Sequence, residues 1–166
     1  MRLAIGADDA AFGLRDVIKD YVIDAGHECT DLSPDASDVE EHYPNVAERV
    51  ARVVATGEAE RGILICGTGI GMSITANKVP GVRAALCHDT YSAERAQKSN
   101  DAQVLTMGAR VIGPELAKAI VDSWLTSEFA GGRSAPKVTE VGAIDDRYRR
   151  MPDSGAGEPV VGGASG

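Results

Sequence analysis

Apolar residues along the chain follow two alternating patterns, short continuous runs and helical repeats. The short runs predict strands over residues 2–6, 27–32, 62–66, 82–87 and 104–107. Apolar residues at helical spacing predict helices over residues 12–25, 43–56, 70–78, 90–99, 114–127 and about 136–150. Strands that alternate with helices predict an α/β fold, a three-layer αβα sandwich with a parallel, Rossmann-like sheet of about five strands. Ligands of such a sheet bind at the carboxyl ends of its strands.

Composition divides the chain into a domain over residues 1–150 and a tail over residues 151–166, which is rich in Gly, Ala, Ser and Pro and is expected to be disordered. The net charge of −8 argues against nucleic acid as a partner, because such partners require a basic surface. The sequence has no signal-peptide pattern and no apolar run long enough for a membrane span. We therefore expect a cytoplasmic protein that does not bind membranes.

The most informative segment is residues 65–73, ICGTGIGMS, which places a cysteine at the end of a buried strand, before a helix. Gly67, Gly69 and Gly71 allow a sharp turn and close approach of a ligand to the backbone. The freed N–H groups and the helix start favour an anion, and they would stabilise a thiolate on Cys66. A thiolate beside an anion-binding loop suits proton removal next to a carbonyl group, where an enediolate must be stabilised.

Two other interpretations of this segment remain open at this point. Cys66 could end a buried strand without any chemical role, since unpaired cysteines are often buried. The glycines could also form a dinucleotide-binding loop, although their G-x-G-x-G spacing departs from the G-x-G-x-x-G fingerprint by one residue. Asp89, at the end of the next predicted strand, suits the ribose contact of that second interpretation.

Other polar residues near predicted loops are weaker candidates for a binding site. Asp8 and Asp9 follow the first strand and could contact sugar hydroxyls, although Asp9 could equally cap the next helix. His88 lies at a carboxyl edge and is a further candidate for substrate binding. Arg133 and Lys137, four residues apart near the last helix, could hold one phosphate, or could simply be solvated.

These features together resemble one family, the type B ribose-5-phosphate isomerases and galactose-6-phosphate isomerases. The resemblance covers residues 2 to about 149 and is carried by ICGTGIG (65–71), ANKVPGVR (76–83), SNDA (99–102) and GARVIG (108–113). It implies a sugar-phosphate isomerase domain, a homodimer or dimer of dimers with active sites shared between subunits, and no metal or other cofactor. The substrate it implies is a small phosphorylated sugar.

The family pattern also implies roles for individual residues. Cys66 matches the base that moves a proton between C1 and C2, and Thr68 matches the residue that assists proton movement between the two oxygens. The backbone of Gly67, Gly69 and Gly71 matches the anion hole. The matching substrate contacts are Asp8, Tyr43 and Asn100 for hydroxyl groups, and Arg110, Arg133 and Lys137 for the phosphate, with the last two reaching in from a partner subunit.

The departures from the family pattern bear on the substrate. Asp9 and Ser99 stand where the family usually has histidines, and the second of these histidines opens a furanose ring. A serine hydroxyl is a poor unaided base, so its presence favours a substrate without a ring. A tetrose 4-phosphate cannot close a furanose ring because its O4 is esterified. Lys137 also replaces a common arginine and loses the bidentate fork.

The sequence is similar to the family branch that interconverts D-erythrulose 4-phosphate and D-erythrose 4-phosphate. The alternatives are an isomerase of ribose 5-phosphate and ribulose 5-phosphate, and a non-catalytic protein that binds a sugar phosphate. Exchange of the substrate's α-hydrogen with solvent separates the enzyme from the non-catalytic protein.

Overall fold

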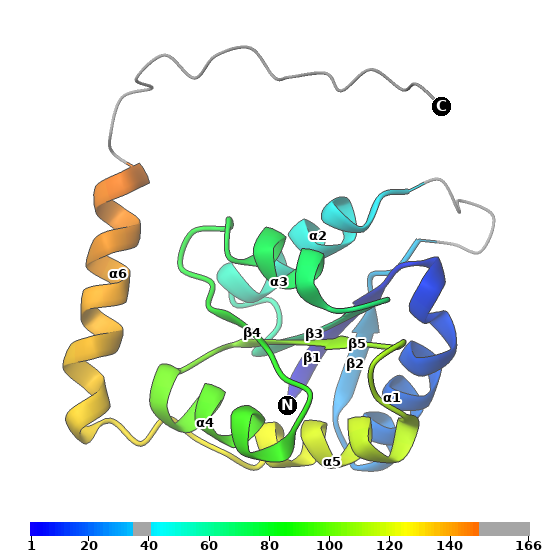
Figure 1. The fold of residues 1–166 in the computed structure, drawn as a ribbon. Helices are drawn as coiled ribbons and strands as arrows, with labels where there is room; N and C mark the ends of the chain where they lie inside the picture. The colour runs from blue at the N-terminus through cyan, green and yellow to red at the C-terminus, as the bar shows by residue number, and fades with distance from the viewer. Residues whose placement is uncertain (35–40, 150–166) are drawn as a thin grey trace.

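A computed structural model describes residues 1–34 and 41–149, and it confirms the predicted α/β fold (Figure 1). Five parallel strands form one sheet in the order β2-β1-β3-β5-β4. Their bounds are Arg2–Ala7 (β1), Glu28–Asp31 (β2), Arg61–Cys66 (β3), Ala84–Leu86 (β4) and Val104–Gly108 (β5). The tail predicted to be disordered, residues 151–166, lies outside the described residues, as do residues 35–40 of the loop after β2.

Helices cover both faces of the sheet (Figure 1). They are α1 (Phe12–Asp24), α2 (Tyr43–Ala55), α3 (Ile70–Ala76), α4 (Thr90–Asn100), α5 (Pro114–Leu125) and α6 (Ala135–Arg149), with short 3-10 helices η1 (Asp9–Ala11) and η2 (Gly132–Ser134). One apolar core joins the sheet to α1, α4 and α5, around the fully buried Trp124. A second, smaller core joins the other face to α2 and α3.

Strand β3 runs through the centre of the sheet and contributes to both cores. Ile63 and Ile65 pack on the side of α1 and α5, whereas Leu64 and Cys66 pack on the side of α2 and α3. This alternation follows from the two-residue period of a strand. It aims the Cys66 side chain at the layer in which α3 begins.

Strand β4 is shorter than the predicted strand over residues 82–87. The Val82 amide donates to Val79 in a turn, and the Arg83 amide donates to the side chain of Gln103. The first two amides of the predicted strand are therefore used before the ladder begins at Ala84. The other predicted elements agree with the structure to within one or two residues at each end.

The strand order reverses direction between β1 and β3. After β1 the chain moves to β2 on one side, and then crosses back to β3 on the other side. Loops that leave a parallel sheet in opposite directions open a crevice between them at the carboxyl ends of the strands. Asp8 directly follows β1 and Cys66 ends β3, so both residues border this crevice.

Helix α6 stands apart from these layers (Figure 1). None of its residues is buried, and Val141, Ile144 and Tyr148 are 51%, 43% and 66% exposed. Its contacts with the rest of the chain include hydrogen bonds from Gly81 to Asp145 and from Arg149 to the Lys78 carbonyl. No helix within residues 1–34 and 41–149 is long and apolar enough to cross a membrane.

Candidate active site

An open pocket of about 580 Å³ occupies the crevice between β1 and β3. It is formed by the end of β1, the start of α2, the loop between β3 and α3, and the segment that follows β5. Its lining residues are Asp8, Asp9, Ala10, Tyr43, Cys66, Gly67, Thr68, Ile70, Gly71, Ile74 and Arg110. Most of the predicted site residues therefore come together within a single chain.

Cys66 lies in the wall of this pocket and is almost fully buried, with 6% of its surface exposed. The amide of Gly69 donates a hydrogen bond to its Sγ over 3.1 Å. A backbone N–H directed at sulfur stabilises the thiolate more than the neutral thiol. The sulfur therefore faces both the pocket and a backbone donor, and its role as a base stays a prediction.

The three glycines of the loop serve different structural purposes. Gly69 has φ +76°, and a Cβ there would lie 2.6 Å from Leu86 Cδ1 and 2.7 Å from the backbone of Met107. Gly71 lies beneath the ring of Tyr43, which a Cβ would approach to 2.5 Å. A Cβ on Gly67 would meet only ordinary contacts with the Arg110 side chain, at 3.5 Å or more.

The acidic pair beside the pocket has an unusual electrostatic setting. Asp8 is partly buried, and its Oδ1 has no hydrogen-bond partner among the described residues. Burial raises the pKa of Asp8, and the charge of Asp9 raises it further, while Arg110 acts in the opposite direction. The alternative that Asp9 caps a helix finds no support, because Ala11 is the N-cap of α1 and no side chain caps that helix.

Besides Gly69, whose amide bonds to Cys66 Sγ, four predicted contacts do not line this pocket in the same chain. His88 instead accepts a hydrogen bond at Nε2 from the Gly108 amide, over 3.0 Å. Asn100 is the last residue of α4, and its carbonyl accepts from Arg83, just before β4. Asn100 and Arg83 therefore lie at the amino edge of the sheet, opposite the pocket.

Arg133 and Lys137 also lie at the amino edge. Arg61, at the start of β3, donates to the carbonyls of Trp124 and Ser127 and so holds the end of α5 at that edge. The chain then continues through η2, which contains Arg133, into the first turn of α6. Both cationic side chains are exposed.

Sequence reasoning missed the apolar part of the pocket. Ile70 and Ile74, one turn apart on α3, line it and are 51% and 58% exposed. The available signal was their i, i+4 spacing, which places two large apolar side chains on one face of a short helix. This face borders the pocket rather than the core.

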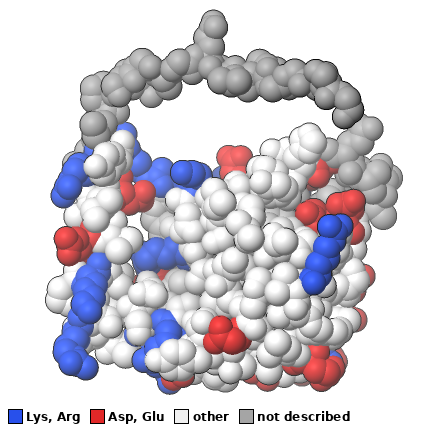
Figure 2. All heavy atoms as spheres, viewed as in Figure 1, with Lys and Arg blue, Asp and Glu red and all other residues white. Residues whose placement is uncertain are grey.

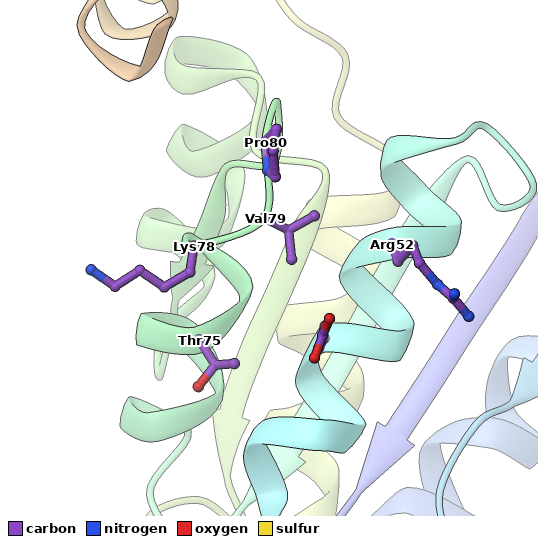
Figure 3. Close-up of a pocket in the computed structure, with 6 residues that line it drawn as sticks. Arg52, Thr75, Lys78, Val79 and Pro80 are labelled. Atoms are coloured by element: carbon purple, nitrogen blue, oxygen red, sulfur yellow. The ribbon is translucent and has the colours of Figure 1, made fainter. Parts of the chain in front are cut away.

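A second cleft, of about 380 Å³, lies between α2 and the end of α3 (Figure 3). Arg52 and Lys78 are among its lining residues, but their charged ends point away from each other, Lys78 away from α2 and Arg52 away from α3 (Figure 3). Two cations that diverge cannot close on one phosphate. This cleft therefore lacks the convergent polar groups of the pocket beside Cys66.

Two observations bear on cofactors. The Asp89 carboxylate accepts hydrogen bonds from the amide and hydroxyl of Ser92 and caps α4, so it is not poised for the ribose contact of a dinucleotide. Within the described part of the chain, no three His, Cys, Asp or Glu residues come close enough together to hold a metal ion.

Comparison with known proteins identifies the family. The model of the Ribose/Galactose Isomerase family matches residues 3–141. The chain is 57% identical over 151 residues to the D-erythrulose-4-phosphate isomerase of Pectobacterium atrosepticum, covering 91% of this chain and 99% of the relative. It is 50% identical over 149 residues to the ribose-5-P isomerase B of Listeria innocua, covering 90% and 100%.

The fold agrees with a solved member of the same group. The structure of ribose-5-phosphate isomerase B from Clostridium thermocellum superposes with a TM-score of 0.86 at 44% identity, over 89% of this chain and 99% of that one. The chain is a sugar isomerase by family, and it belongs to the Ribose/Galactose Isomerase family.

Proposed function

We propose that this protein interconverts D-erythrulose 4-phosphate and D-erythrose 4-phosphate through an enediolate, with Cys66 as the base. The observation that carries the proposal is the 3.1 Å hydrogen bond from the Gly69 amide to Cys66 Sγ, at the wall of a pocket that also contains Thr68, Asp8 and Arg110. This arrangement places the sulfur against a backbone donor and beside groups that can bind hydroxyls and a phosphate. We infer that the enzyme works in the cytoplasm.

The proton movements follow from the positions of these groups. The Cys66 thiolate removes a proton from C1 of the ketose, the electron pair forms a C1–C2 double bond, and the negative charge moves to O2. The Thr68 hydroxyl, which is exposed and accepts from the Ile70 amide over 3.4 Å, carries the O1 proton to O2. Cys66 then returns its proton to C2 as the C1 aldehyde forms. Loop amides at Gly67 and Gly71 stabilise the enediolate.

The choice of a tetrose is supported by Ser99 and by a relative. A pentose 5-phosphate closes a furanose ring that must be opened before C1 can react, whereas an open-chain tetrose 4-phosphate needs no such step. Ser99 cannot supply the base that ring opening requires. The Pectobacterium atrosepticum relative carries the name of an isomerase of this tetrose.

A second copy of the chain completes the site in this proposal. Within one chain, Arg110 is the only Lys or Arg that lines the described pocket, which also contains two carboxylates. A phosphate dianion needs more positive charge than this pocket offers. Asn100, Arg133 and Lys137 lie at the opposite edge, and basic side chains gather on the side of the molecule that carries α6 (Figure 2).

Helix α6 supports the same arrangement. Its apolar residues Val141, Ile144 and Tyr148 recur along one side of the helix and each stays at least 43% exposed within its own chain. Partner contact would cover them, and would bring Arg133 and Lys137 to the pocket of the other copy. The resulting homodimer has two equivalent composite sites, and a dimer of dimers has four.

Mixing two inactive variants tests the shared site. Cys66→Ala lacks the base and Arg133→Ala lacks a phosphate contact, and each pure variant is expected to lose most of its turnover. Random exchange makes half of the dimers mixed, and each mixed dimer has one intact site, so about a quarter of the wild-type activity returns. Activity that stays at the level of the pure variants would place Arg133 and Cys66 in the same chain's site or Arg133 outside it.

The substrate is tested by aldose formation in heavy water from D-erythrulose 4-phosphate and from D-ribulose 5-phosphate. Preference for the tetrose, with deuterium at the α-carbon, supports both the enediolate route and the reasoning from Ser99. Cys66→Ala should abolish turnover while substrate still raises the melting temperature. Near-wild-type turnover of that variant would refute the assignment of the base.

The second candidate is isomerisation of ribose 5-phosphate, because the Listeria innocua relative carries that name at 50% identity. Preference for the pentose in the same assay would favour it, and would mean that another group opens the ring. Binding of both sugars without α-hydrogen exchange would instead indicate a non-catalytic sugar-phosphate protein.

A further inference from the structure

His88 was expected to contact substrate, but in the structure it contacts Gly108, which packs against the loop formed by residues 66–68. It follows β4, is partly buried, and its Nε2 accepts a hydrogen bond from the Gly108 amide over 3.0 Å. A ring nitrogen that accepts from a backbone N–H does so through its lone pair. The ring thus presents a fixed acceptor to the end of β5.

This acceptor adds one hydrogen bond to the β4–β5 ladder beyond the point where the backbone bonds of the ladder end. The last backbone bond between the two segments runs from the Cys87 amide to the Thr106 carbonyl. The next amide of β5 that faces β4 belongs to Gly108, and it bonds to the His88 ring in place of a carbonyl. Because β4 is a short edge strand, this side chain provides the bond that holds the end of β5 on its β4 side.

The end of β5 in turn supports the loop that carries Cys66. The Ala109 amide donates to the Cys66 carbonyl over 2.8 Å, and the Arg110 amide donates to the Gly67 carbonyl over 3.0 Å. A Cβ on Gly108 would lie 2.7 Å from the Cα and carbonyl carbon of Thr68. Residues 108–110 therefore form a backbone platform in direct contact with the Cys66–Thr68 loop.

We propose that His88 is a positioning residue, which holds Gly108 and thereby sets the place of Cys66 and Thr68 relative to substrate. This inference rests on the proposed isomerase function and adds a residue that acts through the backbone rather than by touching substrate. A displacement of about 1 Å at a reacting group can cost about 10²-fold in rate. The platform transmits such a displacement because its contacts with the loop are direct.

A matched pair of amide variants tests the proposal. In His88→Gln the side-chain oxygen can reach the place of Nε2, whereas in His88→Asn it can reach only the place of Nδ1 and falls short of Gly108. We expect His88→Asn to lower kcat by about 10- to 100-fold with KM changed by less than about threefold, and His88→Gln to recover most of the loss. Melting temperatures confirm that both variants are folded, and His88→Leu replaces His88→Asn if the latter is not.

Hydrogen exchange of the peptide that contains residues 104–112 provides a readout that does not require isomerase activity. Exchange at the Gly108 amide should accelerate in His88→Asn and return toward the wild-type rate in His88→Gln, with exchange in β1 as the internal reference. Unchanged exchange in His88→Asn would overturn the proposal whatever the enzyme's substrate. Equal loss of kcat in both variants with normal exchange would also overturn it, since the imidazole would then act on substrate. Inactivity of the wild-type protein would count against the proposed function alone.

Discussion

Substituting Gly69 by alanine isolates the structural demands of the loop behind Cys66. The residue has φ +76°, where an alanine is strained by about 1–2 kcal/mol. A Cβ would also lie 2.7 Å from Met107 C and 2.9 Å from Met107 O, which are backbone atoms near the carboxyl end of the β3–β5 ladder and cannot swing away. Such overpacking adds about 1–3 kcal/mol, for a total of about 2–5 kcal/mol.

The same substitution should impair catalysis as well as stability. If the loop moves to relieve the contact, the Gly69 amide leaves Cys66 Sγ, and a hydrogen bond to a charged group is worth about 1.5–3 kcal/mol. The corresponding loss in kcat is about 10- to 150-fold. The loss of stability corresponds to a fall of about 4–20 °C in melting temperature for a chain of this length.

Gly81→Ala is the matched control for backbone strain. Gly81 has φ +77°, almost the same as Gly69, but a Cβ there would meet nothing within 4 Å. Thermal and chemical unfolding of both variants, together with isomerase kinetics, separate the cost of the close Cβ contact from the cost of placing an alanine at positive φ. Equal destabilisation of the two variants, or wild-type kcat in Gly69→Ala, would refute the reasoning.

Three further predictions concern Gly71, Asp8 and Ser99. Gly71→Ala should displace Tyr43 and raise KM at least tenfold, whereas Gly67→Ala should change KM little, because its new Cβ makes only ordinary contacts. Steady-state kinetics of both variants test this, and equal KM values would contradict it. Burial raises the pKa of Asp8, so this carboxyl favours the folded state at low pH and loses that contribution as pH rises above its unfolded value. The melting-temperature advantage of Asp8→Asn over wild type should therefore grow between pH 4 and pH 7, and a constant difference would show that Asp8 ionises without cost. Ser99→His should raise kcat/KM for ribulose 5-phosphate relative to erythrulose 4-phosphate, and an unchanged ratio in competition assays would remove Ser99 from the substrate argument.

The position of the pocket was largely predictable because much of its lining lies in contiguous sequence. Residues 65–71 contain the strand end, the cysteine and the turn, and a parallel sheet brings Asp8 to the same edge whatever the details of packing. The hydrogen bond of His88 was not predictable, since its partner is a backbone amide and no residue type marks that partner in the sequence.

The residues that lie away from the pocket have a topological reason for their position. Helices that follow the strands of a parallel sheet return to its amino edge, so Asn100 and Arg133 are placed there by the same rule that places Cys66 at the carboxyl edge. Their distance from the pocket could be worked out from element order alone, whereas the use of Arg133 by a second copy was implied only by the family resemblance. That part of the site remains a proposal.

The exposed helix α6 would tie folding to concentration if a second copy of the chain covered it. A helix of 15 residues with no buried residue in its own chain lies near the length at which isolated helices are only marginally stable in water. If a second copy covers Val141, Ile144 and Tyr148, the helix gains its stability from association. Its helical content then depends on the protein concentration. Dilution would then act on this enzyme as a helix-breaking substitution does, unwinding α6 and withdrawing Arg133 and Lys137 from the sites they complete.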